Sequence, residues 1–502
     1  MNRKTILLFW ISLGTLFSFN YVLVDSFVGI NWGRMATQQL VPSMVVDLLL
    51  QNGIPELKLF SPSTNVLPAF ANSSIGLSVT FQDYQLRRMN NSKDIYDWIG
   101  KNVKKHVDNG VDIRYLYVGN EPFTKRYEKR INDEVVYYLE EARKALDRHD
   151  LKYIKTTTAH FTDILTNVTK PSQGDFREDI KDKMLDLLKF LKEHNAPLVI
   201  NIFPIYMLST KQMPVDFAFF DRKNILDYFI KDGPHIYTNI FTFTYDTLVS
   251  ALTKAGYSDM EIMVGQVGWP TDGFPNANPK YAERYHRGLL RFLKRNEGTP
   301  LRPNKTINVY ITALSDENRM VTQWGEYQRH WGIYRHDGSP KYKIDFSLKD
   351  RDEEPTTAKG TVKMPNRWCV YDHSVNADSE KLTEQVNYAC NSSDCTLLSP
   401  GATCDNLNST QRASFAFNMY FQMNSQQIEY CDFQGMGVIT TDDPSTPNCR
   451  FPIEILSIDV VDNGAWKMAS YNEDANPTII PLGLALSALF CIVLFLCLIM
   501  WF

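Results

Sequence analysis

Residues 113–122 read IRYLYVGNEP, a mostly apolar run, Ile113–Val118, followed at once by Gly119, Asn120 and Glu121. A carboxylate placed directly after an apolar strand is costly unless it is paired or lies in a cleft. In parallel β/α folds, functional side chains gather just beyond the carboxyl ends of the strands. The stretch therefore predicts a buried strand with Glu121 at its carboxyl end, where functional side chains are expected.

Seven further short runs have the same apolar character. They are 28–32, 57–60, 76–80, 153–158, 198–202, 261–265 and 309–314. The segments between them often show helical periodicity, as with Val135, Leu139, Ala142 and Leu146. Eight strands alternating with helices over residues 27–349 predict an α/β fold, a (β/α)8 TIM barrel. A doubly wound open sheet is the alternative.

The composition fits a large globular protein and argues against several classes of partner. Of 502 residues, 44% are hydrophobic and 22% charged, and the net charge of −4 gives no sign of nucleic-acid binding. Aromatic residues reach 13%, and such side chains serve either as core or as platforms for sugar rings. No metal or nucleotide motif is present, so no cofactor is expected.

The N-terminus has the pattern of a secretory signal peptide. Arg3 and Lys4 precede the uncharged apolar run Ile6–Phe19, which is too short for an ordinary membrane span. The prediction is a signal peptide over residues 1–26. An uncleaved anchor is the alternative.

The C-terminus has the pattern of a glycosylphosphatidylinositol (GPI) attachment signal. Small residues around Asn463 are followed by a polar stretch and then by the uncharged tail 479–502, where the chain ends. We expect a stalk and attachment region over 453–478, with Asn463 as the attachment site and the tail removed. The protein would then be secreted and held on the outer face of the plasma membrane, in the cell wall space. A plain membrane span is the alternative.

Six glycosylation sequons agree with export. Their asparagines are Asn72, Asn90, Asn167, Asn304, Asn391 and Asn408.

Six cysteines define a second domain. Cys369, Cys390, Cys395, Cys404, Cys431 and Cys449 fall within 81 residues of an otherwise cysteine-poor chain. In an exported segment this spacing predicts three disulfides, with all 15 connectivities open. A zinc site is the competing interpretation. A polar linker, 350–366, separates the barrel from this module, which we place at 367–452.

Both domains resemble known families. Gly29–Gly33, Val118–Glu121, Asn201–Pro204, Gly268–Thr271 and Arg329–Gly332 resemble, in order and spacing, the motifs of glycoside hydrolase family 17, the plant-type endo-1,3-β-glucanases. Trp368–Val370, Ser414–Tyr420 and Cys431–Phe433 resemble the family 43 carbohydrate-binding module. The resemblance implies a β-1,3-glucan ligand such as callose, and we expect a monomer.

Family 17 enzymes are retaining hydrolases with two carboxylates. The resemblance implies that Glu121 is the acid/base and that Asn120 holds a sugar hydroxyl. The nucleophile position of the Glu-x-Gly-Trp-Pro motif holds Gln266. Further substrate-binding residues implied or expected in the cleft are Phe203, Tyr206, Trp269 and Glu317.

Two other polar positions of the family pattern are also changed. Gln328 stands where a glutamate is usual, and Met320 replaces a lysine. A neutral amide attacks and stabilises positive charge poorly compared with a carboxylate. Two hypotheses follow: a weakened endo-1,3-β-glucosidase, or a non-catalytic β-1,3-glucan-binding protein. Asp272, Glu317 and Glu326 are the carboxylates that could substitute for a nucleophile.

Overall fold

The structure is a computed structural model that describes residues 27–126, 133–221, 228–376 and 378–456, and the backbone of two short strands beyond them. The described residues up to Leu456 belong to one compact unit. The predicted signal peptide, the predicted attachment site Asn463 and the apolar tail lie outside the described residues. Within the described part, no helix is both long and apolar enough to cross a membrane.

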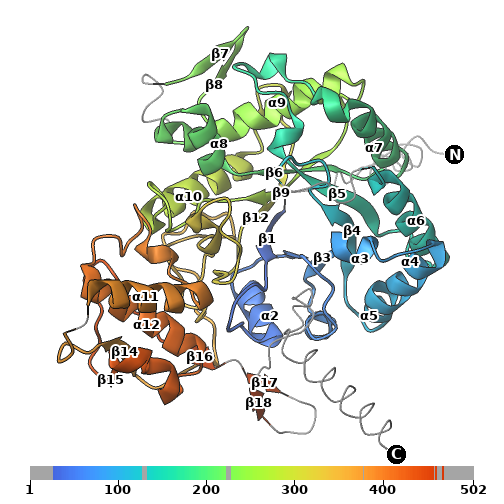
Figure 1. The fold of residues 1–502 in the computed structure, drawn as a ribbon. Helices are drawn as coiled ribbons and strands as arrows, with labels where there is room; N and C mark the ends of the chain where they lie inside the picture. The colour runs from blue at the N-terminus through green and yellow to red at the C-terminus, as the bar shows by residue number, and fades with distance from the viewer. Residues whose placement is uncertain are drawn as a thin grey trace, which may run out of the picture. The chain divides into compact units, whose positions relative to one another are not determined.

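Eight parallel strands close into a barrel, which confirms the predicted (β/α)8 fold and excludes the open sheet (Figure 1). Around the barrel they are β1 (Val28–Trp32), β12 (Asn308–Ile311), β9 (Ile262–Val267), β6 (Leu198–Ile202), β5 (Lys155–Phe161), β4 (Ile113–Asn120), β3 (Gly76–Phe81) and β2 (Glu56–Leu59). Each corresponds to one of the eight apolar runs.

The strands are buried because both of their faces are covered, as parallel sheets require. All the residues of β1, β3 and β9 are buried. A small cluster of its own takes one residue from each of five neighbouring strands: Tyr117, Ala159, Val199, Met263 and Tyr310. Side chains from successive strands fill the interior of a barrel in this way, so it is a packed core rather than a pore.

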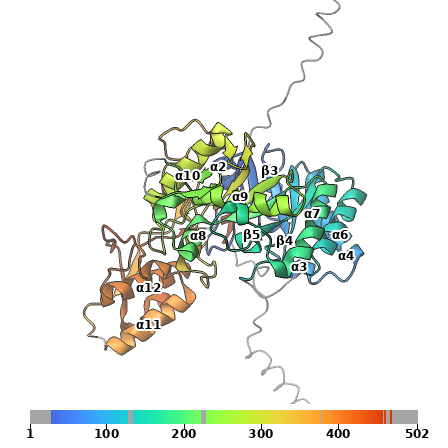
Figure 2. The same ribbon diagram turned by 90° about the horizontal axis from the view of Figure 1, so that it is seen from above.

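The helices surround the strands in both views (Figures 1 and 2). They are α2 (Pro42–Gln51), α3 (Asp83–Leu86), α4 (Ser92–Ile99), α5 (Lys105–Asp108), α6 (Val135–Arg148), α7 (Lys181–Glu193), α8 (Pro204–Lys211), α9 (Ile240–Lys254) and α10 (Pro279–Arg295). The predicted apolar face of α6 is buried, from Val135 to Leu146. These faces cover the barrel, so its functional groups must lie at the ends of the strands.

The second domain is built on two helices and a two-stranded ribbon. Helix α11 (Ser379–Ser392) packs against α12 (Ser409–Met423), and α12 packs against β14 (Trp368–Tyr371), which pairs antiparallel with β15 (Gly437–Thr440). The six cysteines form three disulfides, as predicted, with the pairing Cys369–Cys431, Cys390–Cys395 and Cys404–Cys449. The zinc interpretation is therefore wrong. We call this domain the module.

The predicted linker 350–366 has little regular structure, yet it is bonded to the barrel. Thr356 donates its backbone N–H to Asn52 and accepts a hydrogen bond from the Tyr334 hydroxyl. Its last part forms β13 (Val362–Lys363), which pairs with β16 (Ile455–Leu456) beyond the predicted end of the module. This segment is therefore held by hydrogen bonds to the barrel and by strand pairing with β16.

Candidate active site

Glu121 lies immediately after β4, in a backbone conformation that few side chains adopt. Its φ is +53°, and Gly119 two residues earlier has a φ of +71°. The Glu121 N–H donates to the carbonyl of Ala159 on β5, at 2.9 Å, which fixes the turn. The side chain is 6% exposed. Asn120, just before it, is half-buried and donates its N–H to Asp83.

Asn201 on β6 connects Glu121 with the position of Gln266. Its side-chain amide donates to Glu121 Oε1 at 2.7 Å. In the barrel register, Asn201 is the strand neighbour of Gln266 on β9. Gln266 is 8% exposed. The residues predicted as acid/base and nucleophile position therefore flank one asparagine at the carboxyl edge of the barrel.

The electrostatics favour a protonated Glu121. Burial raises the pKa of its carboxyl above the ordinary value, and the hydrogen bond from Asn201 and the charge of Arg126 only partly oppose the rise. A carboxyl with a raised pKa keeps its proton to a higher pH than an ordinary glutamate, so that it can donate the proton to a leaving oxygen. This is the requirement for a general acid.

Lys58 on β2 places an amine within the barrel near this pair. Burial lowers the pKa of Lys58 to about 7, and the charge of Glu121 opposes that shift. Its Nζ lies 4.3 Å from the centre of the Tyr117 ring and has no hydrogen-bonding partner among the described residues. The amine would also lie about 3.5 Å from a Cβ built on Gly265, directly before Gln266. Lys58 therefore lies beside the end of β9 that carries Gln266.

Glu317 comes after β12 in the chain and lies against the residues that follow β1. Its Oε1 accepts a hydrogen bond from the N–H of Met35 at 2.9 Å, and a side chain at Gly33 would collide with its carboxylate. Burial raises the pKa of Glu317 to about 7. Met320, in the same loop, is held by its carbonyl, which accepts from the Arg329 guanidinium at 2.8 Å. A second carboxyl group with a raised pKa, after that of Glu121, therefore belongs to the loops at this edge.

Phe203 and Tyr206 stand at the start of α8, beside an aromatic group. The Phe161 ring lies 6.0 Å from Phe203 and 5.3 Å from Tyr206, measured between centres. The guanidinium of Arg126 lies 4.5 Å from the Phe161 ring and 4.6 Å from the Trp324 ring. Phe203 and Tyr206 are each partly exposed, so contact of either with a sugar stays a prediction.

Trp269 corrects one expectation. Its side chain is completely buried, and its ring centre lies 5.4 Å from that of Phe219 and 5.9 Å from that of Tyr285. The indole N–H donates to the carbonyl of Asn276 at 3.0 Å. The expectation that Trp269 binds substrate in the cleft is wrong, because its side chain has no exposed surface and belongs to the hydrophobic core.

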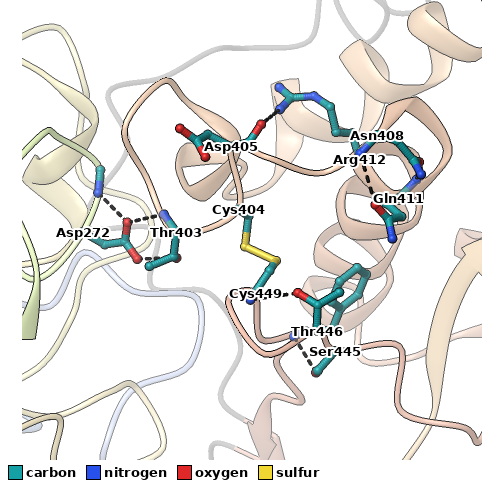
Figure 3. Close-up of a disulfide and its surroundings, with 12 residues drawn as sticks. Asp272, Thr403, Cys404, Asp405, Asn408, Gln411, Arg412, Ser445, Thr446 and Cys449 are labelled. Carbon is teal, nitrogen blue, oxygen red and sulfur yellow. Dashed lines mark hydrogen bonds between the residues drawn. A yellow bond between two sulfur atoms is a disulfide. The ribbon is translucent and has the colours of Figure 1, made fainter.

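Two other carboxylates considered as substitutes for the nucleophile lie near the module. Asp272 accepts from Thr403 of the module, through the N–H at 2.9 Å and the hydroxyl at 2.6 Å (Figure 3). Glu326 is half-buried, and burial raises its pKa. The oxygens of Asp272 are thus engaged in holding the module.

The module makes two further contacts with the barrel, at the motif Arg329–Gly332, which we call the motif loop. Asp394 pairs with Arg329 at 3.0 Å, and the Thr396 hydroxyl bonds to His330 Nε2 at 2.7 Å. The disulfide Cys390–Cys395 closes a loop that holds Asp394 just before its second cysteine. Thr403 likewise precedes Cys404, which pairs with Cys449 (Figure 3). Disulfides therefore brace the edge of the module that meets the barrel.

Sequence reasoning missed three residues of this site: Asn201, Lys58 and Arg126. Asn201 is the first residue of the family motif Asn201–Pro204, but its type and position in the sequence do not indicate its role. Lys58 is the charged residue inside the apolar run 57–60, which is a signal in itself because buried lysines are rare. Arg126 gives no sequence signal. Within the described residues no cluster of histidine, cysteine or acidic side chains could hold a metal ion.

The sequon asparagines all have exposed side chains, as glycosylation requires. They are Asn72, Asn90, Asn167, Asn304, Asn391 and Asn408. Asn408 also caps α12 by accepting from the N–H of Gln411.

Comparison with known proteins assigns both domains to families. The family model "Glycosyl hydrolases family 17" matches residues 28–346, and the X8 domain model, the family 43 carbohydrate-binding module, matches residues 367–438. The chain therefore belongs to glycosyl hydrolase family 17, which confirms the resemblance drawn from the motifs.

The relatives share most of their length with this chain. Glucan endo-1,3-beta-glucosidase 8 of Arabidopsis thaliana is 39% identical over 442 residues, which cover 87% of this chain and 90% of the relative. Glucan endo-1,3-beta-glucosidase 5 of the same plant is 38% identical, with the same coverage. Among solved structures, CJP38, a β-1,3-glucanase and allergen of Cryptomeria japonica pollen, matches with a TM-score of 0.61 and 29% identity. It covers 64% of this chain and all of its own.

Proposed function

We propose that this chain binds a callose-like β-1,3-glucan at the carboxyl edge of its barrel. Family membership and relatives named as glucan endo-1,3-beta-glucosidases support a glycosidase ancestry and this ligand. The retained groups Glu121, Asn201 and Glu317 supply the polar contacts that a sugar needs. Tyr206 and Phe203 offer partly exposed rings beside them.

Glu121 is suited to donate a proton at this edge of the barrel. In a retaining hydrolase one carboxylic acid protonates the leaving oxygen, and a second carboxylate about 5 Å away attacks the sugar. Burial raises the pKa of Glu121 and favours the protonated form. The first half of this chemistry is therefore retained.

The second half is weakened, and the observation that carries this conclusion is Gln266. It flanks Asn201 opposite Glu121 in the strand register and is a neutral amide at the family's nucleophile position. A loss of a thousandfold in rate corresponds to about 4 kcal/mol of barrier, and removing a nucleophile commonly costs at least that. We therefore propose turnover at least a thousandfold below that of an ordinary family member.

This observation also favours a second candidate function. A chain that binds glucan without cleaving it would serve as a surface glucan receptor or adhesion protein. The two candidates differ in one measurable quantity, the rate of hydrolysis of linear β-1,3-glucan.

The test compares the wild-type protein with the Gln266→Glu variant at equal folded concentration. We expect wild-type hydrolysis to be very slow and the variant to gain at least tenfold. Within the restored variant, Glu121→Gln should remove most of the gain on substrates whose leaving group needs a proton. Gln328→Glu makes the same chemical change outside the proposed nucleophile position and should restore nothing.

Wild-type turnover within tenfold of an ordinary family 17 enzyme would contradict the proposal of a missing nucleophile. So would equal gains in the Gln266→Glu and Gln328→Glu variants, because the effect would then come from added charge alone.

We further propose that the protein is secreted and tethered by a GPI anchor, so that its glucan is that of the cell wall space. The signal-like residues 1–26 and the small residues around Asn463 before an uncharged tail support this location. Six exposed sequons and three disulfides agree with an oxidising, extracellular compartment.

A further inference from the structure

The module carries two tyrosines whose hydroxyl groups are bonded to each other. Tyr388 lies on α11 and Tyr420 on α12, two helices that pack side by side (Figures 1 and 2). Their hydroxyl oxygens are 3.0 Å apart, and their ring centres are 5.4 Å apart with the ring planes inclined by 57°. Two phenols from different helices therefore meet at the ends that carry their hydroxyls.

Both phenols are accessible from solvent. Tyr388 is 52% exposed, Tyr420 is partly exposed, and the hydrogen bond between their hydroxyls lies at the surface. Burial, and then the hydrogen bond to Tyr388, raise the pKa of Tyr420 to about 12, so this phenol keeps its proton at neutral pH. A dissolved oxidant would therefore meet Tyr420 as a neutral phenol.

The hydroxyl contact suits the two rings to oxidative coupling. When a phenol loses a hydrogen atom, its unpaired electron is shared with the ring carbons on either side of the one that carries the oxygen, which in tyrosine are Cε1 and Cε2. Because the hydroxyls of Tyr388 and Tyr420 touch, these carbons belong to the ends of the rings that face each other. Exposed side chains rotate rapidly, which supplies the remaining approach. Coupling within one chain is favoured over coupling between molecules because the two groups are already held together.

Tyr137 and Tyr138 form a matched pair that lacks the hydroxyl contact. Their ring centres are also 5.4 Å apart, at 62°, and Tyr137 is 47% exposed. The Tyr138 hydroxyl donates instead to Glu134, at 3.4 Å. Ring proximity is common to both pairs, whereas the bond between hydroxyls distinguishes the pair in the module.

We propose that Tyr388 and Tyr420 are an oxidative modification site, at which a heme peroxidase and hydrogen peroxide join the two rings through their Cε atoms into an intramolecular dityrosine. Each phenol gives one electron to the oxidant and its hydroxyl proton to water. The two radicals pair to form one carbon–carbon bond, each joined carbon then loses its hydrogen as a proton, and each oxygen regains a proton. One peroxide takes up the two electrons and the two protons left over and becomes two waters.

The new bond would join two helices that no disulfide joins directly. The residues are 32 positions apart, and α12 contains no cysteine. A cross-link between distant residues restricts the unfolded chain and so stabilises the folded one. The modified module should therefore keep α11 and α12 linked after its disulfides are reduced. The proposal uses neither the barrel nor a glucan, so it is independent of the proposed function.

The test treats the full secreted protein with a heme peroxidase and limiting hydrogen peroxide, without glucan. We expect monomers that gain the fluorescence of dityrosine and lose the mass of two hydrogen atoms. After reduction and proteolysis, one pair of peptides should remain joined, through Tyr388 and Tyr420. Tyr388→Phe and Tyr420→Phe each keep the ring without its hydroxyl and should lower this product about tenfold or more.

Two control variants remove other phenols. Tyr137→Phe changes the exposed member of the matched pair, and Tyr430→Phe changes a ring whose centre lies 5.7 Å from that of Tyr420. Both should keep the wild-type yield of the joined peptides. A wild-type product that consists mainly of cross-linked dimers, or of dityrosine at Tyr137 and Tyr138, would overturn the proposal. An unchanged dityrosine yield in Tyr388→Phe would do the same. The absence of free thiols before treatment shows that each variant is folded.

Discussion

The contact between Arg329 and Asp394 should contribute strongly to the stability of the protein. Their side chains are 18% and 8% exposed, and the charged atoms lie 3.0 Å apart. Asp394 Oδ1 also accepts from the N–H of Thr396 at 3.1 Å and from its hydroxyl at 2.6 Å. Replacing Asp394 by alanine would leave all of these donors without their acceptor.

The magnitude follows from burial. Breaking a buried ion pair by removing one partner costs about 3–5 kcal/mol. The partial exposure of Arg329 and its second acceptor, the carbonyl of Met320, reduce that cost. We expect Asp394→Ala to lower the free energy of unfolding by about 3 kcal/mol, and Arg329→Ala by about 2 kcal/mol, on the basis of those contacts.

A double-mutant cycle measured by urea unfolding isolates the pair. We expect a coupling energy between the two substitutions of about 1.5–3 kcal/mol. The surface pair Arg295 and Glu297, at 3.6 Å with about half of each side chain exposed, is the control and should give less than about 1 kcal/mol. A coupling between Arg329 and Asp394 as small as that of the control would refute the view that this ion pair fastens the module to the motif loop.

Two further predictions concern stability and location. Burial raises the pKa of Glu317 from 4.5 to about 7, so between these values the folded state binds more protons than the unfolded chain; stability should therefore fall as pH rises from 4.5 to 7, by about 3 kcal/mol from this group. Thermal unfolding at pH 5 and 7.5 should show that fall, and Glu317→Gln should reduce it; an equal fall in both proteins would contradict the assignment to Glu317. A phosphatidylinositol-specific phospholipase should release the protein from membranes, whereas retention beside a released control would establish a spanning tail instead.

The barrel could be predicted from sequence because its signals are local. Each strand is a short apolar run, and the faces of α6 and α7 repeat with helical spacing. The differences lie at the ends, as in β2, which runs from Glu56 to Leu59 rather than from 57 to 60. Strand ends depend on neighbouring strands, which the local pattern does not contain.

The direction of a side chain after a strand was harder to predict. The motif placed Trp269 correctly beyond β9, but the ring is buried by Phe219 and Tyr285, which come from distant parts of the chain. The role of Asn201 could not be predicted for the same reason: its hydrogen bond to Glu121 joins residues that are 80 positions apart in the chain. Such contacts follow from barrel closure, not from any local pattern.

The neutral Gln266 removes more than a nucleophile. A carboxylate there would stand beyond Asn201 from Glu121, and its like charge would raise the pKa of Glu121 further and keep the acid protonated. It would also give the amine of Lys58 an anion on the β9 side, where the lowered pKa of about 7 marks a poorly compensated cation. The Gln266→Glu variant should therefore regain charge balance as well as attack. The measurement is the pH dependence of hydrolysis by the variant and by the slow wild-type protein. A variant profile that extends further toward neutral pH than the wild-type profile would support this coupling, and two profiles of the same shape would contradict it.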